Sequence, residues 1–111
     1  MIDQIRPAQL ATWIRQQEST PVVLDVREPN ELRMASVRPD GFELREIPMN
    51  DVPARLEELD PATPLAVLCH HGARSQRVAQ FLESRGFERV VNIAGGIDAW
   101  TAERDPSVPR Y

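Results

Sequence analysis

The sequence is most informative from Leu65 to Ser75, where it reads LAVLCHHGARS. Its first four residues are apolar without interruption, as expected of a strand that is covered on both faces of a sheet. After the loop, Val78 and Leu82 share one face of a helix, and Gly86 is suited to end it. We therefore predict a buried strand, a short loop carrying a cysteine, and a helix from about Ser75 to Arg85.

The same alternation of short apolar runs and helical spacing continues on both sides of this unit. We predict further strands at Val22–Val26 and Val90–Ile93, with shorter ones at Glu46–Met49 and Ile2–Ile5. Helices are predicted around Leu10–Ile14, after Pro29, at Val52–Leu59 and at Ile97–Glu103. Strands that alternate with helices favour an α/β domain, with a mostly parallel sheet and helices on both of its faces.

The length of 111 residues allows one compact core, which we assign to residues 1–104. Residues 105–111 contain Pro106 and Pro109, cannot continue a helix and are expected to form an extended tail that the chemistry does not need. The longest apolar run is too short for a membrane span, and the first residues lack the apolar segment of a signal peptide. We therefore expect a cytoplasmic protein without a membrane partner.

The charge inventory excludes several classes of function. The net charge is −4, whereas a general nucleic-acid binder needs a basic face. All 13 basic residues are arginine, so neither a Schiff-base lysine nor the lysine of a phosphate-binding Walker loop is present. The single cysteine excludes an internal disulfide and a Cys-x-x-Cys pair. Any second thiol in the chemistry must come from another molecule.

Cys69 is the candidate nucleophile. It follows a predicted buried strand, and ligands of open α/β sheets bind at the carboxyl ends of the strands. Backbone N–H groups from His70 to Ser75, together with the positive end of the following helix, can converge on its sulfur and stabilise an anion. Gly72 lets the loop fold back, with Ala73 after it. The alternative is a small buried residue without chemistry, as many free cysteines are.

His70 and His71 raise the possibility of a metal site with Cys69. Adjacent residues rarely point at one ion, and no further Asp, Glu or Cys lies nearby at ligand spacing. We therefore predict no metal. The two histidines are expected to line the mouth of the pocket, or else to be merely exposed.

Arg74 stands at the start of a helix, where a cation is unfavourable unless it has an anionic partner or ligand. Asp25 ends another strand at the same edge of the sheet and is the expected partner. Arg27 either presents its guanidinium to an anionic donor or forms a surface pair with Glu28 or Glu31. With the two histidines and Arg77, these arginines predict a positive field at the mouth of the pocket.

Three segments together resemble the signature segments of the rhodanese family. They read DVREP at residues 25–29, CHHGARS at 69–75 and NIAGGIDAW at 92–100, and the match spans roughly residues 3–104. The resemblance implies a three-layer α/β/α domain with a five-stranded, mainly parallel sheet. It also implies that Cys69 carries sulfur as a persulfide, without a cofactor. The donor is then thiosulfate or another sulfane-sulfur compound, and the acceptor is cyanide, a small thiol or a thioredoxin-like protein.

The chain departs from the family pattern in one segment. Residues 35–42 read ASVRPDGF where members commonly have a His-Ile-Pro-Gly-Ala-like stretch, and Ser36 stands where a histidine is frequent. For Gly95, Gly96 and Trp100 we expect structural roles, a tight turn into the last helix and an aromatic side chain packed on the sheet.

Two other functions remain open on this fold. Cysteine phosphatases and arsenate reductases place five residues between cysteine and arginine, whereas four separate Cys69 from Arg74, which leaves a smaller cradle. A non-enzymatic sulfur carrier or a regulatory binding module is the second alternative, although inactive relatives typically lose the cysteine that this chain keeps.

Overall fold

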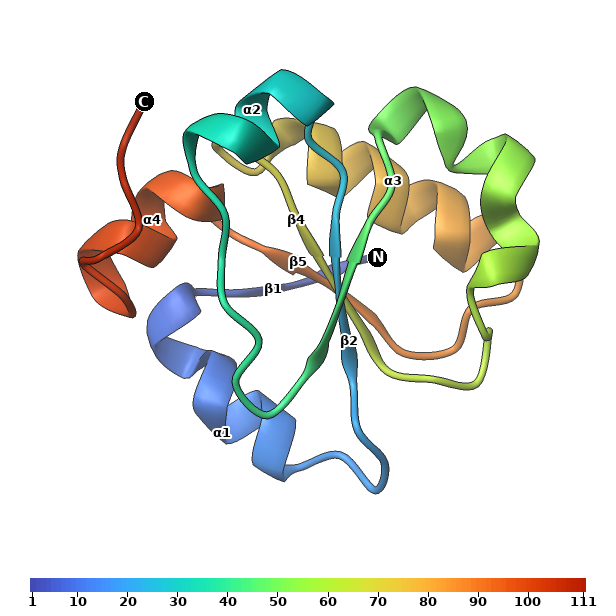
Figure 1. The fold of residues 1–111 in the computed structure, drawn as a ribbon. Coiled ribbons are helices and arrows are strands. Elements are labelled where there is room, and N and C mark those ends of the chain that lie inside the picture. Colours follow the sequence, from blue (N-terminus) through green and yellow to red (C-terminus); the bar gives the residue numbers. More distant parts are fainter.

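The computed structural model describes every residue from Met1 to Tyr111 (Figure 1). The strands are β1 (Asp3–Ile5), β2 (Val22–Asp25), β3 (Glu43–Glu46), β4 (Leu65–Leu68) and β5 (Val90–Ile93). The α-helices are α1 (Leu10–Arg15), α2 (Pro29–Met34), α3 (Ala73–Ser84) and α4 (Gly96–Glu103). Short 3₁₀ helices are η1 (Pro7–Gln9), η2 (Met49–Asp51) and η3 (Pro53–Glu58).

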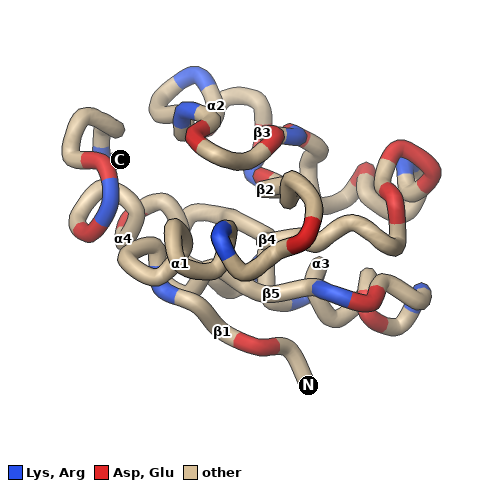
Figure 2. The backbone as a smooth tube through the Cα atoms, turned by 90° about the horizontal axis from the view of Figure 1, so that it is seen from below, with Lys and Arg blue, Asp and Glu red and all other residues tan.

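The five strands form one sheet in the order β1-β5-β4-β2-β3, and every neighbouring pair is parallel. This confirms the predicted α/β class with a five-stranded parallel sheet. The strands β4 and β5 carry no charged residue, and the charged positions lie around them (Figure 2). The uninterrupted apolar run of β4 is thus the mark of a central strand with both faces covered.

Helices cover the two faces of the sheet, and alternate strand residues supply the two cores. On the face covered by α3 and the 3₁₀ segments, Leu24 and Val67 pack with Val78 and Leu82. On the other face, covered by α1 and α4, the buried side chains include those of Leu10, Val23, Ala66, Leu68, Ile93, Ile97 and Trp100. Trp100 is 1% exposed and meets Phe42 edge to face, which confirms its predicted packing role.

Two predicted elements were wrong in place or type. The third strand is Glu43–Glu46, because it is an edge strand whose charged, exposed side chains give no apolar signal. The predicted helix at Val52–Leu59 is instead 3₁₀ structure, with non-helical backbone angles at Arg55. The irregular backbone at Arg55 interrupts the segment, and Pro53 is not the cause, since a proline in the first turn of a helix costs no hydrogen bond.

The tail at residues 105–111 forms neither helix nor strand, yet it packs on the domain. Val108 is 3% exposed and belongs to the core beside α4, where its carbonyl accepts a hydrogen bond from the Thr101 hydroxyl. Tyr111 packs against the same core. No helix of the structure has both the length and the apolar character that crossing a bilayer requires.

The sheet topology brings three site residues to one edge. Cys69 directly follows β4, while Asp25 is level with Leu68 on the neighbouring strand β2. On the other side, Asn92 of β5 is level with Val67. The carboxyl ends of three adjacent parallel strands therefore surround the cysteine.

Candidate functional site

The loop after β4 folds back on the sulfur of Cys69. Gly72 has φ of 109°, a left-handed conformation that side chains disfavour, and its N–H donates to Cys69 Sγ at 3.0 Å. The helix α3 begins at the next residue, so its amino end lies beside the sulfur. The N–H groups of His71, Ala73 and Arg74 have no acceptor within the protein. The loop thus has donors available for an anion near Cys69.

The amino end of α4 fixes the opposite side of the same loop. Ile97 N–H donates to the carbonyl of Cys69 at 2.8 Å, and Asp98 N–H donates to that of His70 at 3.2 Å. A Cβ on Gly96 would lie 2.4 Å from both carbonyl oxygens, so only glycine allows this approach. The amino end of α4 thus engages the carbonyl groups of the loop, and the Gly72 N–H is the loop donor that reaches the sulfur.

Cys69 is 1% exposed and belongs to the apolar core beneath α3, while its hydrogen-bond contacts are with polar groups of the loop. Ser75 Oγ lies 3.3 Å from Sγ and is itself completely buried. The Ser75 hydroxyl donates to Asn92 Oδ1, and Asn92 Nδ2 donates to the carbonyl of Gly72. Asn92, which was not predicted from the sequence as a site residue, therefore ties the two ends of the loop together.

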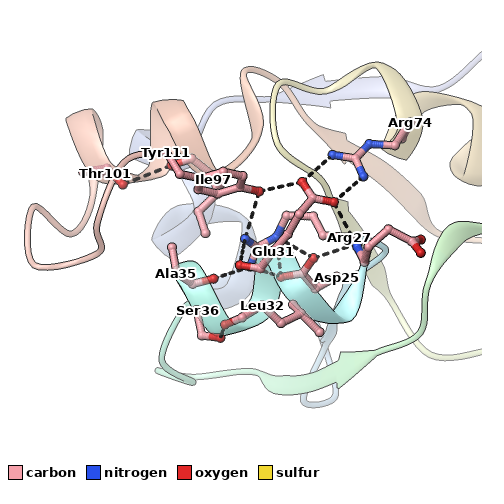
Figure 3. A network of polar contacts seen from close by, with 11 residues as sticks. Asp25, Arg27, Glu31, Leu32, Ala35, Ser36, Arg74, Ile97, Thr101 and Tyr111 are labelled. Carbon is pink, nitrogen blue, oxygen red and sulfur yellow. Dashed lines mark hydrogen bonds and ion pairs between the residues drawn. The ribbon is translucent and has the colours of Figure 1, made fainter.

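Arg74 pairs with Glu31 of α2, not with Asp25 as expected. Its two terminal nitrogens donate to the two carboxylate oxygens at 2.7 and 2.9 Å, and the Tyr111 hydroxyl adds a third donor (Figure 3). The hydrogen bonds from Arg74 are the main cause that lowers the pKa of Glu31 to about 2, and they raise the pKa of Arg74. The helix-terminal cation has the anionic partner that its position demands.

Arg27 does not present its guanidinium to a donor, which corrects the expectation for this residue. The side chain is completely buried and binds both carboxylate oxygens of Asp25 (Figure 3). Its remaining N–H groups donate to the carbonyls of Ala35 and Glu31 and to the Tyr111 hydroxyl. Although burial opposes the charge, the bonds to Asp25 prevail and raise the pKa of Arg27. Asp25 supports the site through this pair.

The two histidines differ in their surroundings. His70 is half-buried, stacked between His71 and Tyr111 with ring centroids 3.9 and 4.0 Å apart, and its Nε2 lies 2.9 Å from the Tyr111 carbonyl. His71 is exposed. With Arg27 buried and Arg74 neutralised by Glu31, the arginines add much less positive field at the mouth than predicted.

The buried residues of the segment that departs from the family pattern belong to the core on the other face of the sheet from the one that contains Cys69. The Ser36 hydroxyl donates to the Leu32 carbonyl near the end of α2, while Ala35, Val37 and Phe42 are buried. Ser36 thus finishes a helix, and the neighbouring Ala35 carbonyl serves Arg27.

Three residues of the site were missed as site residues: Glu31, Asn92 and Tyr111. Asn92 carried a signal, because an amide inside an apolar central strand must find buried partners. Glu31 follows Glu28 by three residues at a helix start, which indicates a capping box rather than a partner for a distant arginine. Nothing in the local sequence of Tyr111 indicates that the tail returns to the loop.

Fold and loop together define an α/β domain with a buried cysteine at the carboxyl end of a central strand, inside a turn whose Gly72 N–H donates to its sulfur. The model of the rhodanese-like domain family matches residues 7–103, so the chain belongs to this family of sulfurtransferases. This confirms the resemblance seen in the sequence.

Individual relatives agree with this assignment. The chain is 34% identical over 104 residues to the thiosulfate sulfurtransferase GlpE of Glaesserella parasuis, with 93% of this chain and 90% of that protein covered. It is 42% identical over 93 residues to the rhodanese-like/PpiC domain-containing protein 12 of Arabidopsis thaliana, covering 80% of this chain. The chain spans only 30% of that relative's length. A solved rhodanese-related protein of Thermoplasma volcanium shares 32% identity, with a TM-score of 0.77 and coverage of 98% and 99%.

Proposed function

We propose that the protein transfers sulfane sulfur through a persulfide on Cys69, with thiosulfate or a related compound as donor. The observation that carries the proposal is the Gly72 N–H aimed at Sγ at the amino end of α3. This arrangement stabilises negative charge on the sulfur without a lysine or a metal ion. The 34% identical thiosulfate sulfurtransferase supports the choice of donor.

The reaction proceeds in two displacements. The Cys69 thiolate attacks the outer sulfur of thiosulfate, an S–S bond forms to the protein, and the S–S bond of thiosulfate breaks with sulfite leaving as the electron-pair acceptor. A nucleophilic acceptor, such as cyanide, a small thiol or a thiol of a thioredoxin-like protein, then attacks the outer sulfur. The thiolate of Cys69 leaves and is regenerated. The loop from His70 to Ser75 holds the anionic sulfur in each state.

Burial restricts what can serve as donor. Cys69 is 1% exposed, so only a donor whose transferable sulfur is a terminal, protruding atom can bring that sulfur to the thiol. Since Arg27 and Arg74 are engaged with Asp25 and Glu31, binding of the donor rests on the loop N–H groups, on His70 and His71, and on the exposed Arg77. Arg74 is also not free to clamp a phosphoryl group, which argues against the phosphatase alternative.

Intact mass before and after incubation with thiosulfate tests the proposal. We expect the mass of the wild type to rise by one sulfur atom, and cyanide to remove it with release of thiocyanate. Cys69→Ser is the matched control and should gain nothing. Sulfur transfer retained in Cys69→Ser, or no mass gain with thiosulfate and with small persulfides alike, would overturn the assignment.

The same samples distinguish the alternatives. A protein that loads one sulfur but turns over only with a partner thiol protein is a carrier. Steady hydrolysis of an aryl phosphate that is lost in Cys69→Ser would instead indicate a phosphatase.

A further inference from the structure

Asn92 is a buried polar residue that accepts a hydrogen bond from Ser75, whose hydroxyl lies beside the sulfur of Cys69. It is 3% exposed and lies on the face of β5 toward α3, since Val91 and Ile93 pack on the other face. Its amide makes hydrogen bonds with Ser75, Gly72 and Gln4. Through Ser75 it is one residue removed from Cys69 Sγ.

The orientation of the Asn92 amide follows from these contacts. Nδ2 donates to Gln4 Oε1 at 2.8 Å and to the Gly72 carbonyl at 3.2 Å, which leaves Oδ1 as the acceptor facing Ser75. A serine hydroxyl has one proton and two lone pairs. Ser75 Oγ lies 2.5 Å from Asn92 Oδ1 but 3.2 Å from the Gly72 carbonyl and 3.3 Å from Cys69 Sγ. The proton therefore goes to Asn92, and the hydroxyl faces the sulfur with a lone pair.

We propose that Asn92 is a positioning residue that holds the Ser75 hydroxyl proton away from Cys69. In this arrangement Ser75 accepts the hydrogen bond of the Cys69 thiol and cannot donate one to the thiolate. The loop N–H groups alone then stabilise the thiolate. A less stabilised thiolate is a stronger nucleophile, because nucleophilicity falls as the acidity of a thiol rises.

The effect of Asn92 is separable from that of the charges around the loop. The charged and titratable groups there are Arg74 of α3, Glu31 of α2, Asp98 of α4, the Asp25–Arg27 pair, His70, His71 and Tyr111. None of them contacts Asn92. Substitution of Asn92 leaves them in place, so their contribution cancels when variants are compared.

The test is a pH titration of the ultraviolet absorbance of the Cys69 thiolate, with Cys69→Ser as the blank. Asn92→Leu removes both amide groups at similar volume and leaves the Ser75 proton two acceptors, the Gly72 carbonyl and Cys69, of which the charged thiolate is the stronger. We expect its titration midpoint to fall by about one pH unit, the size of one hydrogen bond to a charged group. In a Ser75→Ala background the same substitution should leave the midpoint unchanged.

Two outcomes would overturn the proposal. One is a midpoint in Asn92→Leu equal to that of the wild type, and the other is an equal fall in the Ser75→Ala background, which would assign the effect to the loop backbone. Gln4→Met, which removes one partner of Nδ2 and spares Oδ1, is the control and should not shift the midpoint. Asn92→Ala serves the same comparison if Asn92→Leu does not fold.

The inference takes Cys69 as the nucleophile of the proposed sulfur transfer, but the titration uses no sulfur donor. A failure of Cys69 to accept sulfur would therefore leave the measured midpoints, and the conclusion on Asn92, intact.

Discussion

The buried pair of Asp25 and Arg27 is the most costly polar interaction of the domain to break. Both side chains are at most 1% exposed, and removing one partner leaves the other charge uncompensated in the interior. Arg27→Met is therefore expected to lower the free energy of unfolding by about 3–5 kcal/mol, as measured by urea denaturation. Arg33→Met on the exposed face of α2 is the control and should change little.

The double variant Asp25→Leu/Arg27→Met should recover most of that loss, because the orphaned carboxylate is gone. A stable Arg27→Met protein that merely binds thiosulfate more weakly would show that Arg27 contacts the donor after all.

Ionisation of Glu31 is expected to make the free energy of unfolding depend on pH between about 4.5 and 2. Its pKa is lowered to about 2 from 4.5, chiefly by the hydrogen bonds from Arg74, so the folded state keeps the carboxylate ionised where the unfolded chain is protonated. The stabilisation is complete above about pH 4.5 and is lost as the pH falls toward 2. The difference in unfolding free energy between wild type and Glu31→Gln should shrink across this range.

Urea denaturation at a series of pH values measures that difference, with Glu18→Gln, an exposed residue outside the network, as the control. A difference that stays constant down to the lower end of the range would mean that the Arg74–Glu31 pair does not hold the carboxylate charged.

At the scale of elements, the contact of α4 with the cysteine loop is expected to couple stability to sulfur transfer. Gly96→Ala would place a methyl group 2.4 Å from the carbonyls of Cys69 and His70, and its φ of 59° disfavours a side chain as well. We expect a loss of several kcal/mol together with slower persulfide formation in the folded fraction. Melting temperature and the rate of mass gain with thiosulfate measure the two effects.

Gly86→Ala separates the cost of backbone strain at a positive φ from the cost of the steric contact made by Gly96→Ala. Gly86 also has positive φ, at 92°, but a Cβ there meets nothing within 4 Å. It should cost only about 1–3 kcal/mol of backbone strain and leave persulfide formation unchanged. Equal effects of the two substitutions on sulfur loading would refute the special role of Gly96.

At the scale of the molecule, the tail is part of the folded domain although it has no regular structure. Val108 lies in the core beside α4, and burying such a side chain contributes about 1.5–3 kcal/mol. Truncation after Arg104 should therefore lower the melting temperature by several degrees. Turnover of the folded fraction should persist, because the tail contacts His70, Glu31 and Arg27 but not Cys69.

Arg110→Ala, which removes only an exposed pair with Asp98, is the control for that truncation. A folded but inactive truncation would show that Tyr111 takes part in the reaction.

Central elements could be predicted and peripheral ones could not, for a physical reason. The apolar run of β4 and the helical spacing of α3 follow from burial, because a buried strand or helix needs apolar residues at regular positions in the sequence. The edge strand β3 has mostly exposed, charged side chains and carries no such pattern, whereas the segment around η3 has apolar residues at helical spacing but adopts 3₁₀ geometry, which that spacing does not distinguish from an α-helix. At the site, the cysteine loop is local in sequence, whereas Arg74 and Glu31 are 43 residues apart and meet only through the fold.

The stack of Tyr111 on His70 has a practical consequence. Tyr111 is the only tyrosine of the chain, and its ring lies 13° from parallel to a histidine that directly follows Cys69. Any rearrangement of the loop during sulfur loading changes the environment of this phenol. The difference absorbance of this single tyrosine, recorded against the constant background of the two tryptophans, therefore offers an optical record of each half-reaction in real time and without a coupled assay.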